Sequence, residues 1–443
     1  MSSPVDSGGF ARTIGAGAGF AGDRIAPAVR LAASGLLDDL ALECLAERTM
    51  VQALRRRRDD PSAGYDARIR ARLAPLLPYV ADGLRVVSNL GAANPVHAAR
   101  ALAELAGELG IRPLRIAAVV GDDVEDSITA VSWSEPPQGD RLGACAYLGS
   151  DGIAEAFRDG ADVVVTGRVA DSALFAGPLR EALEQTPQAL AGALVVGHLL
   201  ECSAQLTGGN FTAPGGGRLE PAELFDIGYP LASVRPDGSA ELALAPGAPG
   251  RLDRLTCTLQ LLYEVHDPAR YLTPDGVVDM VGVRFEELGH NRVGVSGARL
   301  DERPAQLKVS GFYTLPGQMV DIEIGYAGPG ALERARDAAE IVRLALAQEL
   351  GVSDARIDFV GVDSLLGSAS TPLRCPAPEV RLHTSVPCPD ADLSRSVEDL
   401  MFWLTIGGPA HGGGLRVERR EHVVVADGRI DRESVAEEVV WVA

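Results

Sequence analysis

The sequence lacks the short motifs that identify several large enzyme classes. It contains no P-loop for nucleotide phosphates, no HExxH zinc motif and no GxSxG nucleophile elbow. Its 6 cysteines are scattered without CxxC spacing, so we expect reduced thiols and neither a disulfide framework nor a zinc ribbon. Any active site must therefore be built from side chains that are distant in the sequence.

Positive charge is also scarce. The chain has 41 Lys and Arg against 61 Asp and Glu, a formal net charge of -20. This balance argues against nucleic acids and anionic membranes as partners. The N-terminal residues lack the basic and apolar regions of a signal peptide, and apolar runs such as 193–200 are too short to span a bilayer. We therefore expect a cytoplasmic protein that acts on a small molecule.

The 443 residues, 46% of them hydrophobic, suffice for two or three domains. Through the first half, short apolar runs alternate with helical patterns, which is typical of a parallel sheet covered on both faces. We predict a parallel, Rossmann-like α/β domain over residues 1–245 and a smaller α+β domain over 246–443 that closes over the cleft. The strands expected in the first domain cover residues 40–45, 84–88, 114–120, 162–166 and 193–196.

Polar loops follow the predicted parallel strands. Because the carboxyl ends of such strands share one edge of the sheet, ligands collect there. We therefore expect Glu43, Asn89, Arg168, Asp171 and His198 to line one cleft.

A glycine-rich loop opens the chain. Gly17, Gly19 and Gly22 match G-x-G-x-x-G, and Glu43 follows Gly22 by 21 residues. Together these features are compatible with dinucleotide binding. Asp23, however, is an acid where an anion cradle would favour none. Two interpretations stay open, a nucleotide site and a polar catalytic loop that forms one wall of the cleft.

The segment TGRVADS places Arg168, Asp171 and Ser172 directly after an apolar strand. A guanidinium there can hold a carboxylate or phosphate through two hydrogen bonds. We expect Arg168 to be exposed, so that its replacement by alanine removes anion binding and leaves the fold intact. Asp171 is either a catalytic acid or base or a simple helix cap.

His198 and Cys202 lie four residues apart in a predicted helix and would share one of its faces. Such a pair can form a thiolate nucleophile or an acid–base couple. With Glu201, His198 could also bind a metal. The structural alternative is a satisfied histidine and a buried thiol in the core.

Further candidates are amides and glycines in loops. Asn89 is expected to hold the substrate anion, and Asn94 either binds substrate or caps the following helix. Asp122 and Asp123 could bind Mg²⁺ or form a turn. The loop of Gly208, Gly209 and Asn210, or the loop around His411, is expected to form a lid.

Several ordered blocks resemble the acyclic terpene utilisation family of the AtuA type over nearly the whole chain. This resemblance implies a role in the metabolism of branched acyl-CoA compounds, beside carboxylases and hydratases. The sequence departs from the family pattern at His411. The matching blocks include IGAGAGFAGDR (14–24), SNLGAANP (88–95), VVVTGRVADSALFAGPL (163–179), VGHLLECSAQLTGGNF (196–211), LLYEVHDPARYLTPD (261–275) and GGPAHGGG (407–414).

These observations lead us to expect a homo-oligomeric lyase, of the carbon–carbon or carbon–oxygen type, acting on a carboxylated, hydroxylated or acyl-CoA substrate. The alternatives are an NAD(P)-dependent oxidoreductase and a non-catalytic acyl-binding partner of a carboxylase. The cofactor stays open, with a CoA-linked substrate or a divalent metal as candidates. The expected catalytic residues are Glu43, Asp171, His198 and Cys202, and the expected substrate-binding residues are Gly17, Gly19, Gly22, Asp23, Asn89, Asn94, Arg168, Ser172, Gly208, Gly209, Asn210 and His411.

Overall fold

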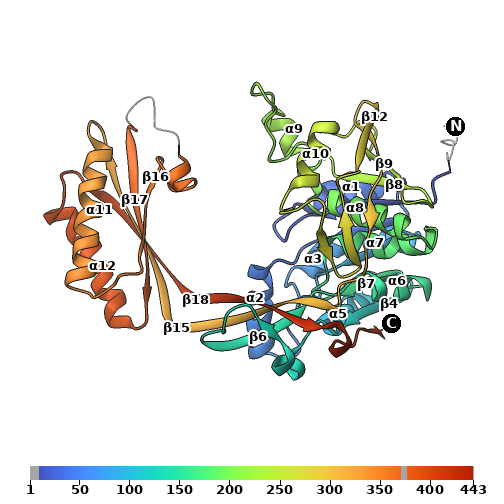
Figure 1. Ribbon diagram of the computed structural model, residues 1–443, viewed down its shortest axis with the longest axis horizontal. Coiled ribbons are helices and arrows are strands. Elements are labelled where there is room, and N and C mark those ends of the chain that lie inside the picture. Colours follow the sequence, from blue (N-terminus) through green and yellow to red (C-terminus); the bar gives the residue numbers. More distant parts are fainter. Residues whose placement is uncertain (1–8, 371–376, 443) are drawn as a thin grey trace. The chain divides into compact units, whose positions relative to one another are not determined.

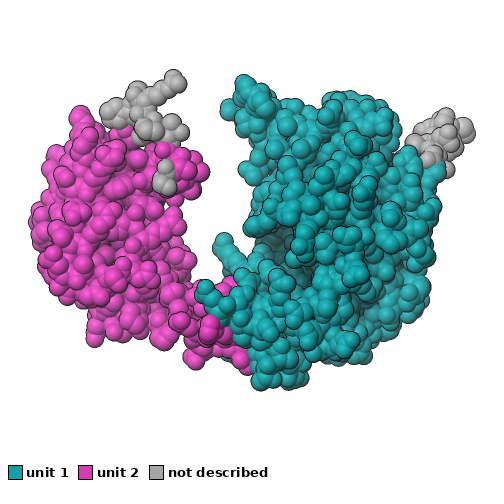
Figure 2. Space-filling model, in the orientation of Figure 1, with its two compact units in different colours: residues 1–135, 142–311, 427–443 teal, residues 136–141, 312–426 magenta. Residues whose placement is uncertain are grey.

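The computed structural model describes residues 9–370 and 377–442. The chain divides into two compact units (Figure 2). Unit 1 comprises residues 1–135, 142–311 and 427–443, and unit 2 comprises residues 136–141 and 312–426. Residue 245, after which we expected a domain boundary, lies inside unit 1.

Five parallel strands form the centre of unit 1. In spatial order they are β1 (Arg12–Ala18), β2 (Asp39–Leu42), β3 (Arg85–Ser88), β7 (Val163–Thr166) and β4 (Ile116–Val120). Four of the five expected apolar runs are confirmed as strands β2, β3, β4 and β7. The fifth prediction, residues 193–196, is wrong. That run lies inside α8 (Pro187–Glu201), a helix buried on nearly all sides and therefore apolar around its whole circumference.

Antiparallel strands extend this sheet at both edges. β8 (Pro230–Val234) and β9 (Ala240–Leu244) continue it beyond β1, and β19 (Glu438–Trp441) pairs with β4. The sheet is therefore mixed, with ten strands in the order β12-β13-β9-β8-β1-β2-β3-β7-β4-β19. Since β1 lies between β2 and an antiparallel strand, it does not occupy the strand-order reversal of the two-halved dinucleotide-binding fold.

Helices cover both faces of the sheet. On one face, α1 (Ile25–Ala33) and α5 (Pro95–Glu108) pack over the core together with α3 and α4. On the other, α6 (Asp151–Arg158), α7 (Asp171–Leu179) and α8 pack over a second cluster of buried apolar residues. None of the described helices is long and apolar enough to cross a membrane. The remaining elements of unit 1 include α2 (Glu47–Asp59), α3 (Ile69–Leu73), α4 (Leu77–Ala81), β5 (Ser132–Trp133), β6 (Asp140–Ala146), α9 (Pro221–Phe225), α10 (Arg254–Leu262), β10 (Tyr271–Thr273), β11 (Gly276–Asp279), β12 (Arg284–Gly289), β13 (Arg292–Ser296) and β14 (Arg299–Leu300).

Unit 2 has the β-α-β-β-α-β order of a ferredoxin-like fold. Its strands lie in the order β16-β17-β15-β18, and α11 and α12 lie together on one face of the sheet (Figure 1). The longest strand of this sheet, β15, runs without a break through Pro316 and Gly317. The elements are β15 (Gln306–Ala327), α11 (Ala331–Gln348), β16 (Arg356–Val360), β17 (Glu379–Cys388), α12 (Ala391–Gly407) and β18 (Gly413–Asp431). Residues 306–311 of β15 and 427–431 of β18 belong to unit 1.

A buried ion-pair cluster stabilises the amino end of the parallel sheet. The Asp39 side chain is fully buried and pairs with the guanidinium groups of Arg12 and Arg85. We expect Asp39→Ala to lower the free energy of unfolding by about 3 kcal/mol, since it leaves two cations without their partner. Urea unfolding measures this change. The control is Asp226→Ala, which breaks an exposed pair with Arg30 and should cost no more than about 1 kcal/mol. Equal effects of the two substitutions would contradict this expectation.

Candidate active site

Unit 1 contains a cavity of about 800 Å³ at the carboxyl ends of the parallel strands. Gly19 follows β1, Glu43 follows β2 and Arg168 follows β7, and each of them lines this cavity. Asp171 contributes from the start of α7 and His198 from the last turn of α8. Residues up to 179 positions apart thus share one chamber, because parallel strands deliver their following loops to the same edge.

Glu43 is held firmly and is almost excluded from solvent. Its Oε1 accepts hydrogen bonds from Asn89 Nδ2 at 2.9 Å and from the Leu45 backbone N–H at 2.7 Å. Among the described residues, none donates a hydrogen bond to Oε2. Burial raises the pKa of Glu43 to about 7, against the opposing effects of these hydrogen bonds and of Arg168. Asn89 itself does not line the cavity but orients Glu43 from behind.

Arg168 is 2% exposed, so our expectation of an exposed arginine is wrong. The reason is that its guanidinium lies against the Tyr147 ring, 4.8 Å from the ring centroid, and donates to the Leu45 carbonyl at 2.7 Å. Its Nε and Nη2 atoms are buried without a hydrogen-bond partner. Unpaired buried donors of a charged group are costly, and these two atoms are hydrogen-bond donors that the structure leaves unused.

Asp171 begins α7 and borders the cavity. Its Oδ1 lies 3.7 Å from Arg168 Nη1 and is buried without a hydrogen bond, so the side chain does not act as a helix cap. The side chain is 42% exposed, but it faces the cavity and protein surrounds it elsewhere. Burial and the nearby carboxylates of Glu43 and Glu201 raise the pKa of Asp171 well above its usual value.

His198 pairs with Glu201 rather than with Cys202. Its Nδ1 lies 2.9 Å from Glu201 Oε1, and its Nε2 donates to the Leu261 carbonyl at 3.1 Å. Burial opposes the charged imidazolium, but the Glu201 carboxylate outweighs it and raises the pKa of His198. Burial also raises the pKa of the Cys202 thiol to about 12. The thiol therefore stays protonated at neutral pH, and we do not assign Cys202 as a nucleophile.

Two tyrosines of the cavity were absent from the sequence prediction. The Tyr147 hydroxyl donates to Glu47 Oε1 at 2.7 Å, and the Tyr271 ring lies 5.0 Å from the His198 ring, centroid to centroid. Tyr147 follows β6, a strand that the apolar pattern did not predict. Tyr271 lies within the family block LLYEVHDPARYLTPD, which was the one signal pointing to it.

The glycine-rich loop packs against protein. A Cβ atom at Gly19 would lie 2.5 Å from the Cys202 carbonyl carbon, and one at Gly17 would lie 2.8 Å from the Leu42 side chain. The Gly19 N–H donates to Asp23 Oδ2 at 2.6 Å, so it is not free for a pyrophosphate. These glycines therefore permit close packing. Gly22 and Asp23 do not line the cavity.

Other expected site residues lie away from this cavity. Asn94 stands at the N-cap position of α5 and donates to the Ala63 carbonyl at 2.7 Å, beside a separate cavity of about 170 Å³. Ser172 is fully buried. Gly208, Gly209 and Asn210 belong to unit 1 without lining the cavity, and His411 lies in unit 2.

The family profile of the acyclic terpene utilisation family protein AtuA matches residues 12–441. The chain belongs to this family. A search of curated proteins and a search of solved structures found no match. Membership of this family confirms the resemblance seen in the sequence.

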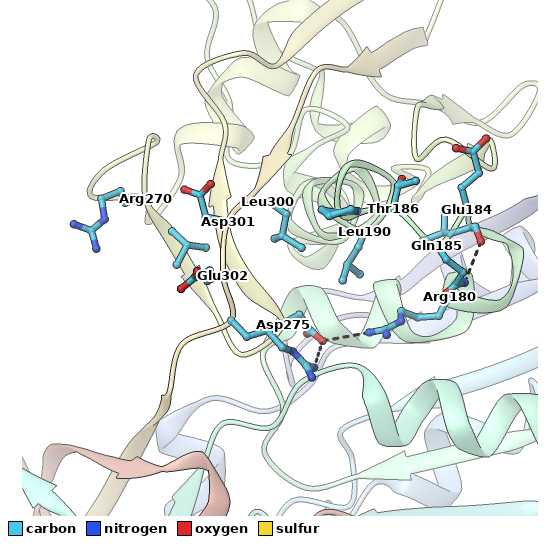
Figure 3. A pocket seen from close by; sticks show the side chains of 14 residues that line it. Arg180, Glu184, Gln185, Thr186, Leu190, Arg270, Asp275, Leu300, Asp301 and Glu302 are labelled. Carbon is cyan, nitrogen blue, oxygen red and sulfur yellow. Dashed lines mark hydrogen bonds and ion pairs between the residues drawn. The ribbon is translucent and has the colours of Figure 1, made fainter.

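A second cavity of this family member, about 1040 Å³, also lies in unit 1 (Figure 3). Its charged floor is paired internally: the fully buried Asp275 side chain lies 3.6 Å from Arg180 and 3.4 Å from Arg303. Ser150 donates to the same carboxylate at 2.8 Å. None of the expected site residues lines it, and Asp275 is paired with Arg180 and Arg303, so the cavity of Glu43 and Arg168 is the candidate active site.

Metal ligands are not grouped in the described part of the chain. No cluster of three or more His, Cys, Asp or Glu side chains there is placed to hold a metal ion. Asp122, a candidate Mg²⁺ ligand, accepts a hydrogen bond from the Arg168 backbone N–H at 2.8 Å, and Asp123 pairs with Arg57 at 2.8 Å. Asp122 thus supports the loop that carries Arg168, whereas Asp123 holds α2 through Arg57.

The raised pKa of Glu43 predicts a specific pH dependence of stability. Its folded-state value of about 7 lies above the ordinary 4.5, so the folded protein retains a proton that the unfolded chain releases. The stabilisation from this proton is complete below pH 4.5 and is lost as the pH rises to about 7.

We therefore expect the free energy of unfolding of Glu43→Gln to rise by about 3 kcal/mol relative to that of the native chain as the pH increases from 4.5 to 7.5. Urea unfolding of both proteins across this range measures the difference. The control is Glu264→Gln, an exposed glutamate at the same cavity, whose difference from the native chain should stay constant. A pH-independent difference for Glu43→Gln would contradict the expectation.

Proposed function

We propose that this protein is a lyase of the hydratase type, in which Glu43 and Asp171 exchange protons with a carboxylated or acyl-thioester substrate. The observation that carries this proposal is the pair of carboxyl groups with raised pKa values beside the buried Arg168 in one cavity. Addition or removal of water beside a carbonyl requires a base for the α-proton, an acid for the leaving hydroxyl and a donor for the developing enolate.

The two carboxyl groups suit different roles. Glu43 has a pKa of about 7 and an Oε2 without a described donor, as a general base near neutral pH requires. Asp171 lies beside Glu43, and burial together with the carboxylates of Glu43 and Glu201 raises its pKa well above the usual value, so we assign it as the general acid. Enzymes separate acid from base in this way by giving similar groups different environments.

Arg168 suits the anionic part of the substrate. Its two unpaired guanidinium nitrogens can donate to a carboxylate or to the oxygen of an enolate. Asn89 is then a positioning residue, because its amide holds Glu43 Oε1 and does not reach the cavity. His198 and Glu201 line the same cavity as a hydrogen-bonded pair, in which the Glu201 carboxylate raises the pKa of His198.

The rim of the cavity includes an apolar part. Phe20 is 59% exposed and Leu272 is 54% exposed, and Tyr263 lies exposed at the same cavity. Large apolar side chains left open beside a polar chamber are typical of ligand sites. We therefore propose that the substrate carries a hydrocarbon chain that rests on this rim.

Proton abstraction can be tested without knowledge of the full reaction. The protein is incubated in D₂O with a panel of 3-hydroxy acids, unsaturated acids and their CoA thioesters, and deuterium at the α-carbon is followed by NMR. We expect exchange or net hydration with at least one class, and Glu43→Gln should lower the rate by about 10²- to 10⁴-fold. Glu264→Gln is the matched control and should retain the native rate.

The pH profile gives a second readout of Glu43. As a base with a raised pKa it is active when deprotonated, so the exchange rate should rise with pH and level off above about pH 7. Binding of the panel without exchange or turnover at any pH would sink the lyase proposal and favour the acyl-binding alternative. Saturable nicotinamide binding in calorimetry would instead revive the oxidoreductase hypothesis.

Arg168→Lys tests the role of the guanidinium while keeping its charge. We expect an approximately tenfold weaker binding of carboxylate ligands, because lysine cannot provide the two-pronged hydrogen bond. Calorimetry measures the binding, and urea unfolding checks the fold. Arg168→Ala should in addition lower stability by several kcal/mol, because the guanidinium is buried against Tyr147 and its backbone carbonyl partner. Unchanged binding in the lysine variant would show that the anion lies elsewhere.

A further inference from the structure

The single lysine of the chain lies at the candidate cavity. Of the 41 Lys and Arg residues, Lys308 is the only lysine. Every other residue of this basic pair of types is an arginine, so Lys308 carries the single side-chain ammonium group of the chain. The two cations differ physically, since lysine is a compact, mobile point charge and arginine a planar fork. This position is therefore a candidate for a specific role.

Lys308 and Arg168 both lie against the ring of Tyr147. Lys308 Nζ is 4.8 Å from the ring centroid, and Arg168 Cζ is also 4.8 Å from that centroid. The two charges are thus at most twice this distance apart. Lys308 is 54% exposed, so its ammonium can reach a ligand that passes through the cavity mouth.

A second cation accompanies Lys308. Arg429, on β18, is exposed and lines the same cavity, and it has no acidic partner among the described residues. The nearest carboxylate to Lys308 is Asp427 at 3.8 Å, and both of these side chains are exposed. Such an exposed contact is weak and can be exchanged for a ligand. Glu47 also lines the cavity, and its Oε1 accepts a hydrogen bond from the Tyr147 hydroxyl at 2.7 Å.

We propose that Lys308 and Arg429 form a second anion-binding position at the cavity mouth, so that the substrate carries two anionic groups. Arg168 binds the first anionic group inside the cavity. The exposed side chains of Lys308 and Arg429 bind the second group, which is a carboxylate or a phosphate. This inference rests on the proposed function in taking the cavity as the substrate site. It adds a substrate class, molecules with two anionic groups. Arg168 Cζ and Lys308 Nζ are each 4.8 Å from the Tyr147 ring centroid, so these two cations lie no more than about 10 Å apart.

Calorimetry with small probes tests the proposal on the full-length protein. Adipate carries two carboxylates, 3-phosphonopropionate carries a carboxylate and a phosphonate, and hexanoate carries one carboxylate. We expect adipate or 3-phosphonopropionate to bind at least tenfold more tightly than hexanoate, and the tighter of the two identifies the second group. In the double variant Lys308→Gln, Arg429→Gln this advantage should vanish while hexanoate binding stays unchanged. Arg158→Gln, an exposed cation on α6, is the control.

The single lysine allows a direct spectroscopic check. Reductive methylation with ¹³C-formaldehyde keeps the charge of Lys308 and labels it, apart from the N-terminal amine. The Lys308 resonance is the one missing from Lys308→Arg, and it should shift on addition of the preferred dianion but not of hexanoate.

The outcomes separate the two proposals. If dianions bind no better than hexanoate, or if the double variant keeps their advantage, the second position is overturned while the role of Arg168 stands. If Arg168→Lys leaves the binding of every probe unchanged, the assignment of Arg168 to the first anionic group fails instead.

Discussion

The candidate site depends on one constraint, the burial of several carboxyl groups close together in one cavity. Glu43, Asp171 and Glu201 share one chamber at the sheet edge, where each ionised carboxylate raises the energy of its neighbours. In open solvent these groups would all be ionised at neutral pH and equivalent. Inside the chamber, burial raises the pKa values of Glu43 and Asp171 above their ordinary values.

Hydrogen bonds and packing from neighbouring residues hold the cavity side chains in place and offset the free-energy cost of burying them. Arg168 is fixed by Tyr147 and the Leu45 carbonyl, and its backbone is held by Asp122. Glu43 is fixed by Asn89, which also accepts a hydrogen bond from the Cys44 backbone N–H. Residues buried behind the cavity thus determine the orientation of those that line it, as precise acid–base chemistry requires.

Membership of the AtuA family and the geometry of the cavity contribute different information. The family match establishes what the chain is related to, whereas the raised pKa values and unpaired guanidinium nitrogens indicate what its cavity can do. The apolar and cationic residues at the rim are the basis of the proposal that the substrate has a hydrocarbon part and charged groups. The same cavity accounts for all of these features within unit 1.

The sequence alone determined the central strands and the convergence of their loops, because apolar runs of strand length and the geometry of parallel sheets are local or general properties. It also predicted that Glu43, Asn89, Arg168, Asp171 and His198 would line one cleft, and all of them except Asn89 line the same cavity. Only the tertiary structure decided that Arg168 is buried, that His198 pairs with Glu201 and that Gly19 packs against Cys202. These features depend on which side chains from distant segments fill the space between the loops. For the same reason Tyr147 and Lys308 had no local signal: each acquires its role from contacts across the fold and not from its neighbours in the chain.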